Sequence, residues 1–259
     1  MEIDTQLLEG HISIEAALEA RTRPIYKILI QQDKAQSSRI KRQQRQRHLT
    51  HIQQMAASQD IPVQFAPAAE IDTQANGQSH GGLIAVVGPR HFVSMGDLLH
   101  NRECPFVVML DGIEDPFNFG QAVRALYAAG ATGLVVRPRN WMTAAGVVAR
   151  ASAGASERME TAVAEDAETA ADFFRQQGLQ IACTGQTEST SLYAADLTQP
   201  LFLVLGGEKR GITRSFMRNA DVVLEIPYGR SYGYALGAAA AAAIISFEVM
   251  RQRQGAVTG

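Results

Sequence analysis

The chain has 259 residues, of which 46% are hydrophobic and 19% are charged, and its formal net charge is −2 at pH 7. This composition is typical of a globular protein with a hydrophobic core, and the length favours two domains over one. The charge gives no general reason to expect nucleic acid as a partner, although a local basic patch can still attract it.

The cysteines and the apolar segments restrict where the protein works. Cys104 and Cys183 are far apart and form no CxxC pair or disulfide framework, which favours a reducing cytosol. The first residues, MEIDTQLLEGH, lack the basic and apolar regions of a secretory signal. The longest apolar run, 235–245, has 11 residues and is too short to span a bilayer. We therefore expect a soluble cytoplasmic protein with no membrane contact.

Residues 1–88 alternate helical and strand patterns and predict a small α/β domain. The expected helices are 13–20, about 34–57 and a short one after Pro67, and the expected strands are 25–30, around 62–65 and 83–87. Asn76-Gly77 predicts a turn before the last of these strands. Residues 89–104 follow as a linker that includes a short helix.

Residues 105–259 alternate more regularly and predict a doubly wound α/β domain. Strands are expected at 106–110, 134–136, 179–183, 201–205 and 222–226, with helices between them, including 119–129. Such domains bind ligands beyond the carboxyl ends of their strands. Three glycine-bearing loops lie at such ends, after Leu110, Leu205 and Ile226.

One basic run, KRQQRQRH from Lys41 to His48, lies in the long polar helix of the first domain. It presents Lys41, Arg42, Arg45 and Arg47 over a broad face. The run is equally compatible with a solvated helix and with a surface that contacts phosphates, because electrostatics supplies most non-specific affinity for nucleic acid.

The first glycine-bearing loop is DGIEDPFNFGQAVR, residues 111–124. Asp115-Pro116 favours a turn, and Asn118 is a good N-cap for the helix that follows. Gly120 allows close approach of a ligand or of backbone, and Arg124 lies one turn later on the same side. Either Asn118 simply caps the helix while Arg124 forms a surface salt bridge, or the helix start receives an anion beside Arg124.

The second glycine-bearing loop, LVLGGEKRGI, covers residues 203–212. It has neither the spacing of a phosphate-binding P-loop nor that of the dinucleotide fingerprint. Taken alone, it predicts only a sharp bend after a buried strand, with Glu208 capping or pairing with Arg210. A nucleotide-binding oxidoreductase is therefore disfavoured.

Four blocks in this order and spacing resemble the SpoU/TrmH family, the RNA 2′-O-ribose methyltransferases of the SPOUT superfamily. They are DGIEDPFNFGQAVRALYAAGATGLVV, ARASAGASERM, LFLVLGGEKRGI and the Ile-Pro loop before a small-residue helix. The resemblance of these blocks extends over residues 105–252. The first domain resembles the RNA-binding module of the family, which is related to a ribosomal protein, through LEGHISIEAALEARTRPIYKILI and SHGGLIAVV.

The resemblance implies an α/β fold with a deep trefoil knot, a homodimer, no metal, and S-adenosylmethionine bound in the knot. The cofactor would lie against Leu205, Gly206, Gly207, Glu208, Gly211, Ile226, Pro227 and Ala235. Asn118 and Arg124 would be the catalytic residues, with Glu157 supporting Arg124. Arg42, Arg45 and Arg150 would contact RNA, and the appended domain favours ribosomal over transfer RNA.

The sequence departs from the family at its third motif, which normally reads Ile-Pro-Met, a glycine, and then Ser-Leu-Asn-Val-Ser. Tyr234 stands at the serine, Leu236 at the asparagine and Arg230 at the glycine. Lys209 replaces another usual glycine. Two hypotheses follow: an active methyltransferase, or a catalytically inactive RNA-binding protein that has lost its cofactor.

Overall fold

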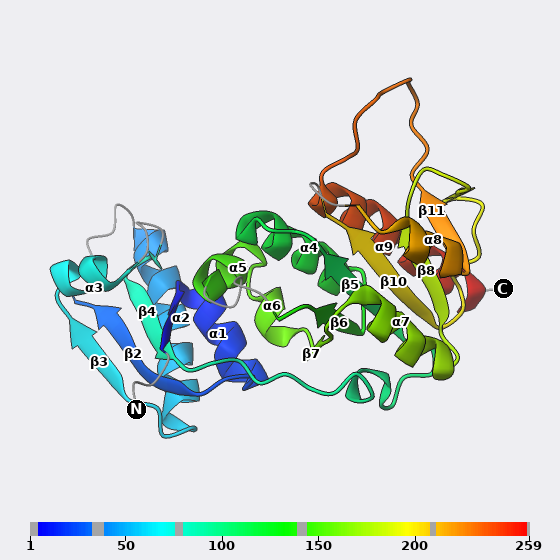
Figure 1. Ribbon diagram of the computed structural model, residues 1–259. Helices are drawn as coiled ribbons and strands as arrows, with labels where there is room; N and C mark the ends of the chain where they lie inside the picture. Colours follow the sequence, from blue (N-terminus) through cyan, green and yellow to red (C-terminus); the bar gives the residue numbers. More distant parts are fainter. Residues whose placement is uncertain (1–4, 33–38, 76–79, 139–143, 208–210, 258–259) are drawn as a thin grey trace. The chain divides into compact units, whose positions relative to one another are not determined.

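The computed structural model describes residues 5–32, 39–75, 80–138, 144–207 and 211–257 (Figure 1). The chain folds into two compact units. The first comprises residues 1–91 and 142–158, and the second comprises 92–141 and 159–259. Among the described residues, no helix combines the length and hydrophobicity that a membrane span requires.

The first unit is built on a four-stranded sheet in the order β1-β4-β2-β3. Strands β1 and β2 pair antiparallel with β4, and β2 pairs parallel with β3. The strands are β1 (Gln6–Glu9), β2 (Ile25–Gln31), β3 (Val63–Ala66) and β4 (Leu83–Val87). The helices are α1 (His11–Ala20), α2 (Arg39–Ala57), α3 (Ala68–Gln74), α5 (Ala145–Ala151) and α6 (Ala155–Arg158). The core lies where Ile28 and Ile30 pack with Ile14, Leu18 and Ile52.

Residues 142–158 belong to the first unit, although the sequence expectation places them in the second domain. Two glycines allow this segment to pack closely. A Cβ at Gly146 would lie 2.5 Å from the Leu7 carbonyl oxygen, and one at Gly154 would lie 2.6 Å from the Ala16 methyl group. The glycine of ASAGASE therefore serves helix packing within the first unit.

The second unit is a parallel sheet of seven strands in the order β7-β6-β5-β10-β8-β11-β9. The strands are β5 (Phe106–Asp111), β6 (Gly133–Val136), β7 (Thr161–Val163), β8 (Gln180–Thr184), β9 (Thr190–Ser191), β10 (Leu201–Gly206) and β11 (Val222–Glu225). The helices are η2 (Asp97–Leu99), α4 (Pro116–Ala128), α7 (Ala167–Gln176), α8 (Arg214–Asn219) and α9 (Ala238–Val257).

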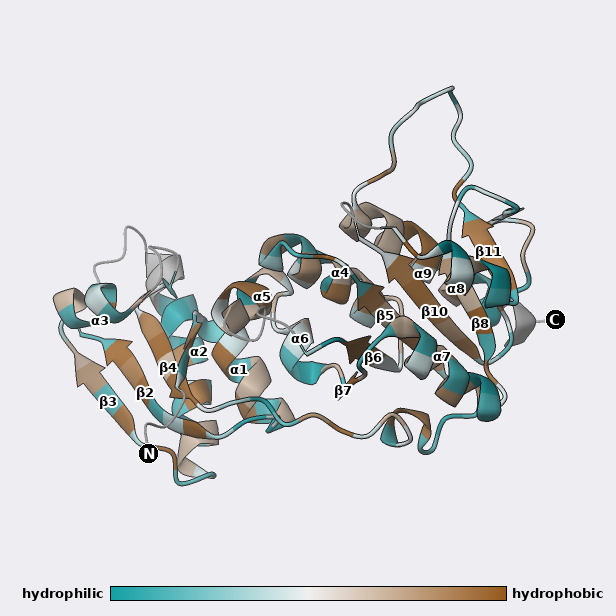
Figure 2. Cartoon of the chain, viewed as in Figure 1, coloured by the Kyte–Doolittle hydropathy of each residue, from teal (hydrophilic) through white to brown (hydrophobic). Residues whose placement is uncertain are grey.

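The central strands are apolar because both faces of the sheet are covered. Figure 2 shows hydrophobic residues along β10 and β8, whereas α7 carries many hydrophilic ones. On one face, Phe174 of α7 stacks on Phe202 of β10 with ring centroids 4.6 Å apart. Helix α4 packs against α9, and Gly120 and Ala122 are among the buried residues of α4. The α/β fold with a parallel sheet expected from the sequence is confirmed.

Several local expectations need correction. Helix α4 begins at Pro116 and is capped by Asp115, whose carboxylate accepts from the backbone N of Asn118 at 2.7 Å. Asn118 is therefore inside the first turn and is not the N-cap. Strands β1, β7 and β9 were not expected. The turn expected at Asn76-Gly77 lies outside the described residues, and the trefoil knot stays a prediction.

Candidate functional site

A pocket of about 500 Å³ opens at the carboxyl ends of β8, β10 and β11, which lie side by side in the parallel sheet (Figure 1). Its far wall is the start of α9. The residues that line it are Thr184, Gly185, Gln186, Gly206, Gly207, Gly211, Leu224, Glu225, Ile226, Tyr228, Tyr234, Ala235, Leu236, Gly237, Ala238 and Ala241. The pocket occupies the position where doubly wound sheets bind ligands.

Five of the eight residues expected to hold the cofactor line this pocket: Gly206, Gly207, Gly211, Ile226 and Ala235. Leu205 lies directly beneath it as a buried residue of β10, and Pro227 lies exposed in the loop that follows β11. Glu208 lies outside the described residues. The structure therefore brings together the second and third glycine-bearing loops.

The close packing of two loops explains a glycine at the base of the pocket. A Cβ at Gly207 would lie 2.0 Å from the carbonyl oxygen of Gly112, and Gly112 itself adopts a φ of 81°. The loop after β10 thus touches the loop after β5, which leads into α4. The contact places the loop that precedes α4 against a residue that lines the pocket.

Sequence reasoning missed the wall contributed by β8. Thr184 ends this strand, and its Oγ1 accepts a hydrogen bond from the Gly206 backbone N at 3.3 Å. Gly185 and Gln186 continue the wall. No motif marks these three residues, but they follow a buried parallel strand, and that position is the one signal that pointed to them.

Besides Thr184 and Gln186, the polar groups in the pocket come from β11 and the loop after it. Glu225 lines the pocket, and its carboxylate accepts a hydrogen bond from the Ser189 hydroxyl at 2.7 Å. The phenol oxygen of Tyr228 accepts from the backbone N of Leu236 at 3.0 Å. Tyr234 is 74% exposed at the rim. The substituted third motif therefore forms a wall of the pocket, with Tyr234 where the family pattern has serine and Leu236 where it has asparagine.

Helix α4 carries both residues expected to be catalytic. Asn118 is half-buried in its first turn, and Arg124 is exposed. Among the described residues, Arg124 forms no ion pair or hydrogen bond. Its guanidinium is always charged, so it is available to an anion.

The residues expected to contact RNA lie in the first unit. Arg45 is half-buried on α2, where its Nη2 donates to the Gln31 carbonyl at 3.2 Å, and Arg42 lies on the same helix. Arg150 forms an ion pair with Glu9, whose side chain is buried. The charge of Arg150 is thus compensated inside the protein.

Glu157, expected to support Arg124, has a different partner. Its carboxylate binds the Arg23 guanidinium through two hydrogen bonds, Nε–Oε2 at 2.9 Å and Nη2–Oε1 at 3.1 Å. Both side chains are buried. Arg90 lies close by, and burial lowers its pKa to about 10. Glu157 is therefore part of a buried charge cluster of the first unit.

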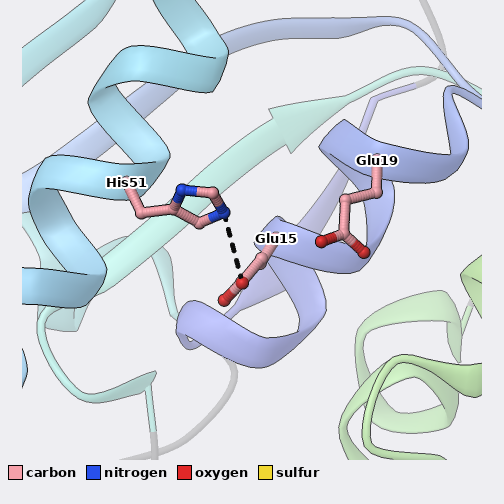
Figure 3. A group of neighbouring side chains, drawn as sticks. All are labelled: Glu15, Glu19 and His51. Atoms are coloured by element: carbon pink, nitrogen blue, oxygen red, sulfur yellow. Dashed lines mark ion pairs between the residues drawn. The ribbon is translucent and has the colours of Figure 1, made fainter.

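One group of side chains in the described part of the chain is close enough to share a cation: Glu15 and Glu19 of α1 with His51 of α2 (Figure 3). His51 Nε2 lies 3.5 Å from Glu15 Oε1, and Glu19 already pairs with Arg158 at 2.5 Å. Glu19 and His51 are exposed and Glu15 is half-buried. We interpret this group as surface ion pairs between helices.

Comparison with known proteins places this geometry in a family. The model of the SpoU rRNA methylase family matches residues 105–247, and the model described as RNA 2′-O ribose methyltransferase substrate binding matches residues 7–93. The 23S rRNA (guanosine-2′-O-)-methyltransferase RlmB of Pseudomonas putida is 30% identical over 204 residues, which cover 77% of this chain and 82% of that protein.

Solved structures share the fold. The AdoMet-bound rRNA methyltransferase of Sinorhizobium meliloti superposes with a TM-score of 0.74 at 21% identity, covering 95% of this chain and 87% of that one. The SpoU methyltransferase AviRb of Streptomyces viridochromogenes, in complex with AdoMet, superposes with a TM-score of 0.75 at 21% identity, covering 98% and 92%. On the family match over more than half of its length, this chain belongs to the SpoU rRNA methylase family.

Proposed function

We propose that this protein transfers a methyl group from S-adenosylmethionine to the ribose 2′-hydroxyl of a nucleotide in structured RNA, with ribosomal RNA as its substrate. Family membership supports RNA methyl transfer. The P. putida relative, a 23S rRNA (guanosine-2′-O-)-methyltransferase, supports the ribose position and the RNA class. The observation that carries the proposal is the pocket at the carboxyl ends of β8, β10 and β11.

The residues present fit the proposed cofactor. A volume of about 500 Å³ is within the range of small-molecule sites. Glycine and alanine in the walls leave backbone groups accessible, and the Glu225 carboxylate can accept hydrogen bonds from amino or hydroxyl groups of a ligand. When bound there, S-adenosylmethionine supplies an electrophilic methyl group on a cationic sulfur. The chain contributes alignment and a largely apolar surrounding.

Arg124 positions the RNA in this proposal. The ribose oxygen gains the methyl carbon and loses its proton, and an arginine is a poor acceptor because its pKa exceeds about 12. An exposed guanidinium with no partner in the described structure is instead suited to a phosphate. Asn118 lies on the same helix, and the loop before this helix contacts the pocket-lining Gly207 through Gly112. The proton passes to another base or to water.

The altered third motif is the feature on which the two hypotheses, an active methyltransferase and an inactive RNA-binding protein, differ. Tyr234 and Leu236 stand where the family pattern has serine and asparagine, and both residues line the pocket. A pocket of the right size despite these substitutions supports retained cofactor binding. The rate of methyl transfer depends on how the cofactor and the ribose hydroxyl are aligned, and a binding measurement does not report that alignment.

Cofactor binding is the first test, with a matched pair of variants on α9. Ala241 lines the pocket, whereas Ala240 is exposed beside it and does not. We expect Ala241→Phe to weaken S-adenosylmethionine binding by about tenfold or more in isothermal titration, a loss of about 1.4 kcal/mol. Ala240→Phe should bind as the unmodified protein does.

The next measurement is 2′-O-methylation of ribosomal RNA transcripts by the unmodified protein and by Arg124→Ala. Methylation that disappears in Arg124→Ala while cofactor affinity stays unchanged would support the proposed role. No binding of S-adenosylmethionine or S-adenosylhomocysteine at millimolar concentration would overturn the proposal in favour of an inactive RNA-binding protein.

We also propose that the protein works in the cytoplasm as a homodimer, that its second domain is knotted, and that residues 1–88 form its RNA-binding domain. The family resemblance supports these points. Sedimentation equilibrium would test the dimer: a mass of one chain at micromolar concentration would contradict it.

A further inference from the structure

The first unit contains a second hollow, of about 480 Å³, between the end of β2, the middle of α2 and the edge strand β3. Its lining is mostly polar, and none of the described residues that line it is acidic. Gln31 is the last residue of β2 and Gln32 follows it, while Arg45, Gln46 and Gln53 come from α2 and Phe65 from β3. Arg45 is one of the residues expected to contact RNA, but the proposal above assigns no role to the hollow itself.

Phe65 is the first unusual feature of the hollow. It lies on β3, at the edge of the sheet, and its side chain is 57% exposed. Its neighbour in the ladder is Ile30 of β2, which is buried in the core. An exposed phenylalanine alone is unremarkable, but here its ring borders a polar hollow that also contains a cation. An aromatic face and a cation together form a surface on which a nucleobase can stack.

Arg45 is the second feature. Its Nη2 donates to the Gln31 carbonyl at 3.2 Å, while its Nε is inaccessible to solvent and has no hydrogen-bond partner among the described residues. Burial lowers its pKa from the ordinary value, yet an arginine stays protonated at neutral pH. A partly buried cation with an unused donor is costly unless a ligand or water completes its bonds.

The surrounding charge favours an anionic ligand. Helix α2 reads RIKRQQRQRHLTHIQQMAA and contains five arginines and lysines and no acidic residue. Arg45 also lines a second, smaller hollow of about 260 Å³, together with His11, His48 and His80. In the part of the chain that the structure describes, no acidic residue lines this second hollow either. The amino-terminal half of the helix, which carries all five of these cations, is therefore suited to a phosphate backbone.

We propose that the hollow beside Phe65 binds one unpaired nucleotide of the RNA substrate. Its base stacks on the Phe65 ring, and Arg45 donates to a phosphate or to a base carbonyl. The glutamine amides hydrogen-bond the base edge, because each amide offers both donors and an acceptor. Proteins that recognise RNA sequence act on single-stranded bases in this way, whereas the bases of a duplex are already stacked and paired. This inference rests on the proposed action on RNA.

The test compares two fluorescent RNA probes: a hairpin with an unpaired loop, and a duplex of the same stem without the loop. Affinity is measured by fluorescence anisotropy. We expect Phe65→Ala to weaken hairpin binding by roughly tenfold, as for one lost base–aromatic stack, and to leave duplex binding unchanged. Phe65→Trp, which keeps an aromatic face, should restore hairpin binding.

Arg45→Ala and Arg47→Ala form a matched pair, because both remove one cation from α2 and only Arg45 lines the hollow. We expect Arg47→Ala to weaken both probes equally, through electrostatics alone. Arg45→Ala should weaken the hairpin further than the duplex. A hairpin with 2-aminopurine in its loop adds a direct readout, since stacking on Phe65 quenches it and Phe65→Ala removes the quenching.

Equal loss for both probes in Phe65→Ala, or no loss in either, would overturn the inference, as would a hairpin that the unmodified protein does not prefer. Cofactor titration keeps the two proposals apart. Hairpin preference without S-adenosylmethionine binding would remove the proposed function and keep this site. If Phe65→Ala methylates RNA at the full rate and binds it with full affinity, the proposed function stands and the nucleotide site beside Phe65 does not. If Phe65→Ala lowers the melting temperature, the arginine pair decides the question.

Discussion

Replacing Glu157 by alanine should destabilise the first unit by about 3–5 kcal/mol, the cost of breaking a buried ion pair. Arg23 and Glu157 are 4% and 1% exposed and share two hydrogen bonds, at 2.9 and 3.1 Å. Removing the carboxylate leaves the Arg23 guanidinium buried without its partner, and Arg90 close by. Against a typical stability of 5–15 kcal/mol, the loss would be a large fraction of the total.

Amide hydrogen exchange measured by mass spectrometry on the full chain is the assay, because it reports the opening of each unit separately. In Glu157→Ala, amides of α1 and β4 should exchange about 100-fold faster or more, following the factor of ten for each 1.4 kcal/mol. Amides of β10 in the second unit serve as the internal control. Glu157→Gln, which keeps the shape and part of the hydrogen bonding, should cost less.

A different result would refute this reasoning. If Glu157→Ala exchanges like the unmodified protein while RNA methylation collapses, Glu157 acts on the chemistry, as the family resemblance suggests. The double variant Arg23→Ala with Glu157→Ala should lose less stability than the sum of the two single variants, since neither charge is then left alone.

Three further outcomes are expected. Asp115→Ala should lower the melting temperature by about 2–4 °C, the effect of losing an N-cap worth about 1 kcal/mol, and an unchanged value would contradict the cap. Gly207→Ala should abolish S-adenosylmethionine binding because its Cβ would lie 2.0 Å from a carbonyl oxygen, whereas Gly229→Ala, with nothing within 4 Å, should bind normally in the same titration. Burial raises the pKa of Cys183 from 9.0 to about 11, so its neutral thiol stabilises the fold below pH 9 and this contribution is lost as the pH rises towards 11. At pH 8 a thiol reagent should therefore label Cys104 and leave Cys183 unmodified unless the protein is unfolded.

The large elements could be predicted because their patterns follow from burial. Strands 106–110 and 201–205 are continuous apolar runs, and the structure confirms them as β5 and β10, covered on both faces. Strands β7 and β9 are three and two residues long and carry no period, so only their neighbours in the sheet define them. A hydrophobic period cannot be recognised in segments this short.

The start of α4 shows how a local choice is decided. Asp115 and Asn118 are both good capping residues, and the sequence expectation chose Asn118. Pro116 decides which of the two is the N-cap, because proline is favoured at the first helical position and its ring fixes φ. The capping residue is therefore the one immediately before the proline.

The candidate site was predictable where a motif marks it and not elsewhere. Gly206, Gly207 and Ile226 came from the family pattern, and the structure places them on one pocket. Thr184 and Glu225 join them only because parallel strands end at the same edge of the sheet. The pairing of Glu157 with Arg23 spans 134 residues, and no local pattern reports a contact so distant.

The walls of the pocket are made at different times during synthesis of the chain. Its walls come from β8, β10, β11 and the first turn of α9, and α9 is the last of these to be made. A nascent chain that has completed β11 has the floor of the pocket and lacks one wall. The cofactor can stabilise only a structure that it binds, so it gives no help to the earlier steps of folding. Capacity to bind it should appear abruptly, when α9 docks against α4.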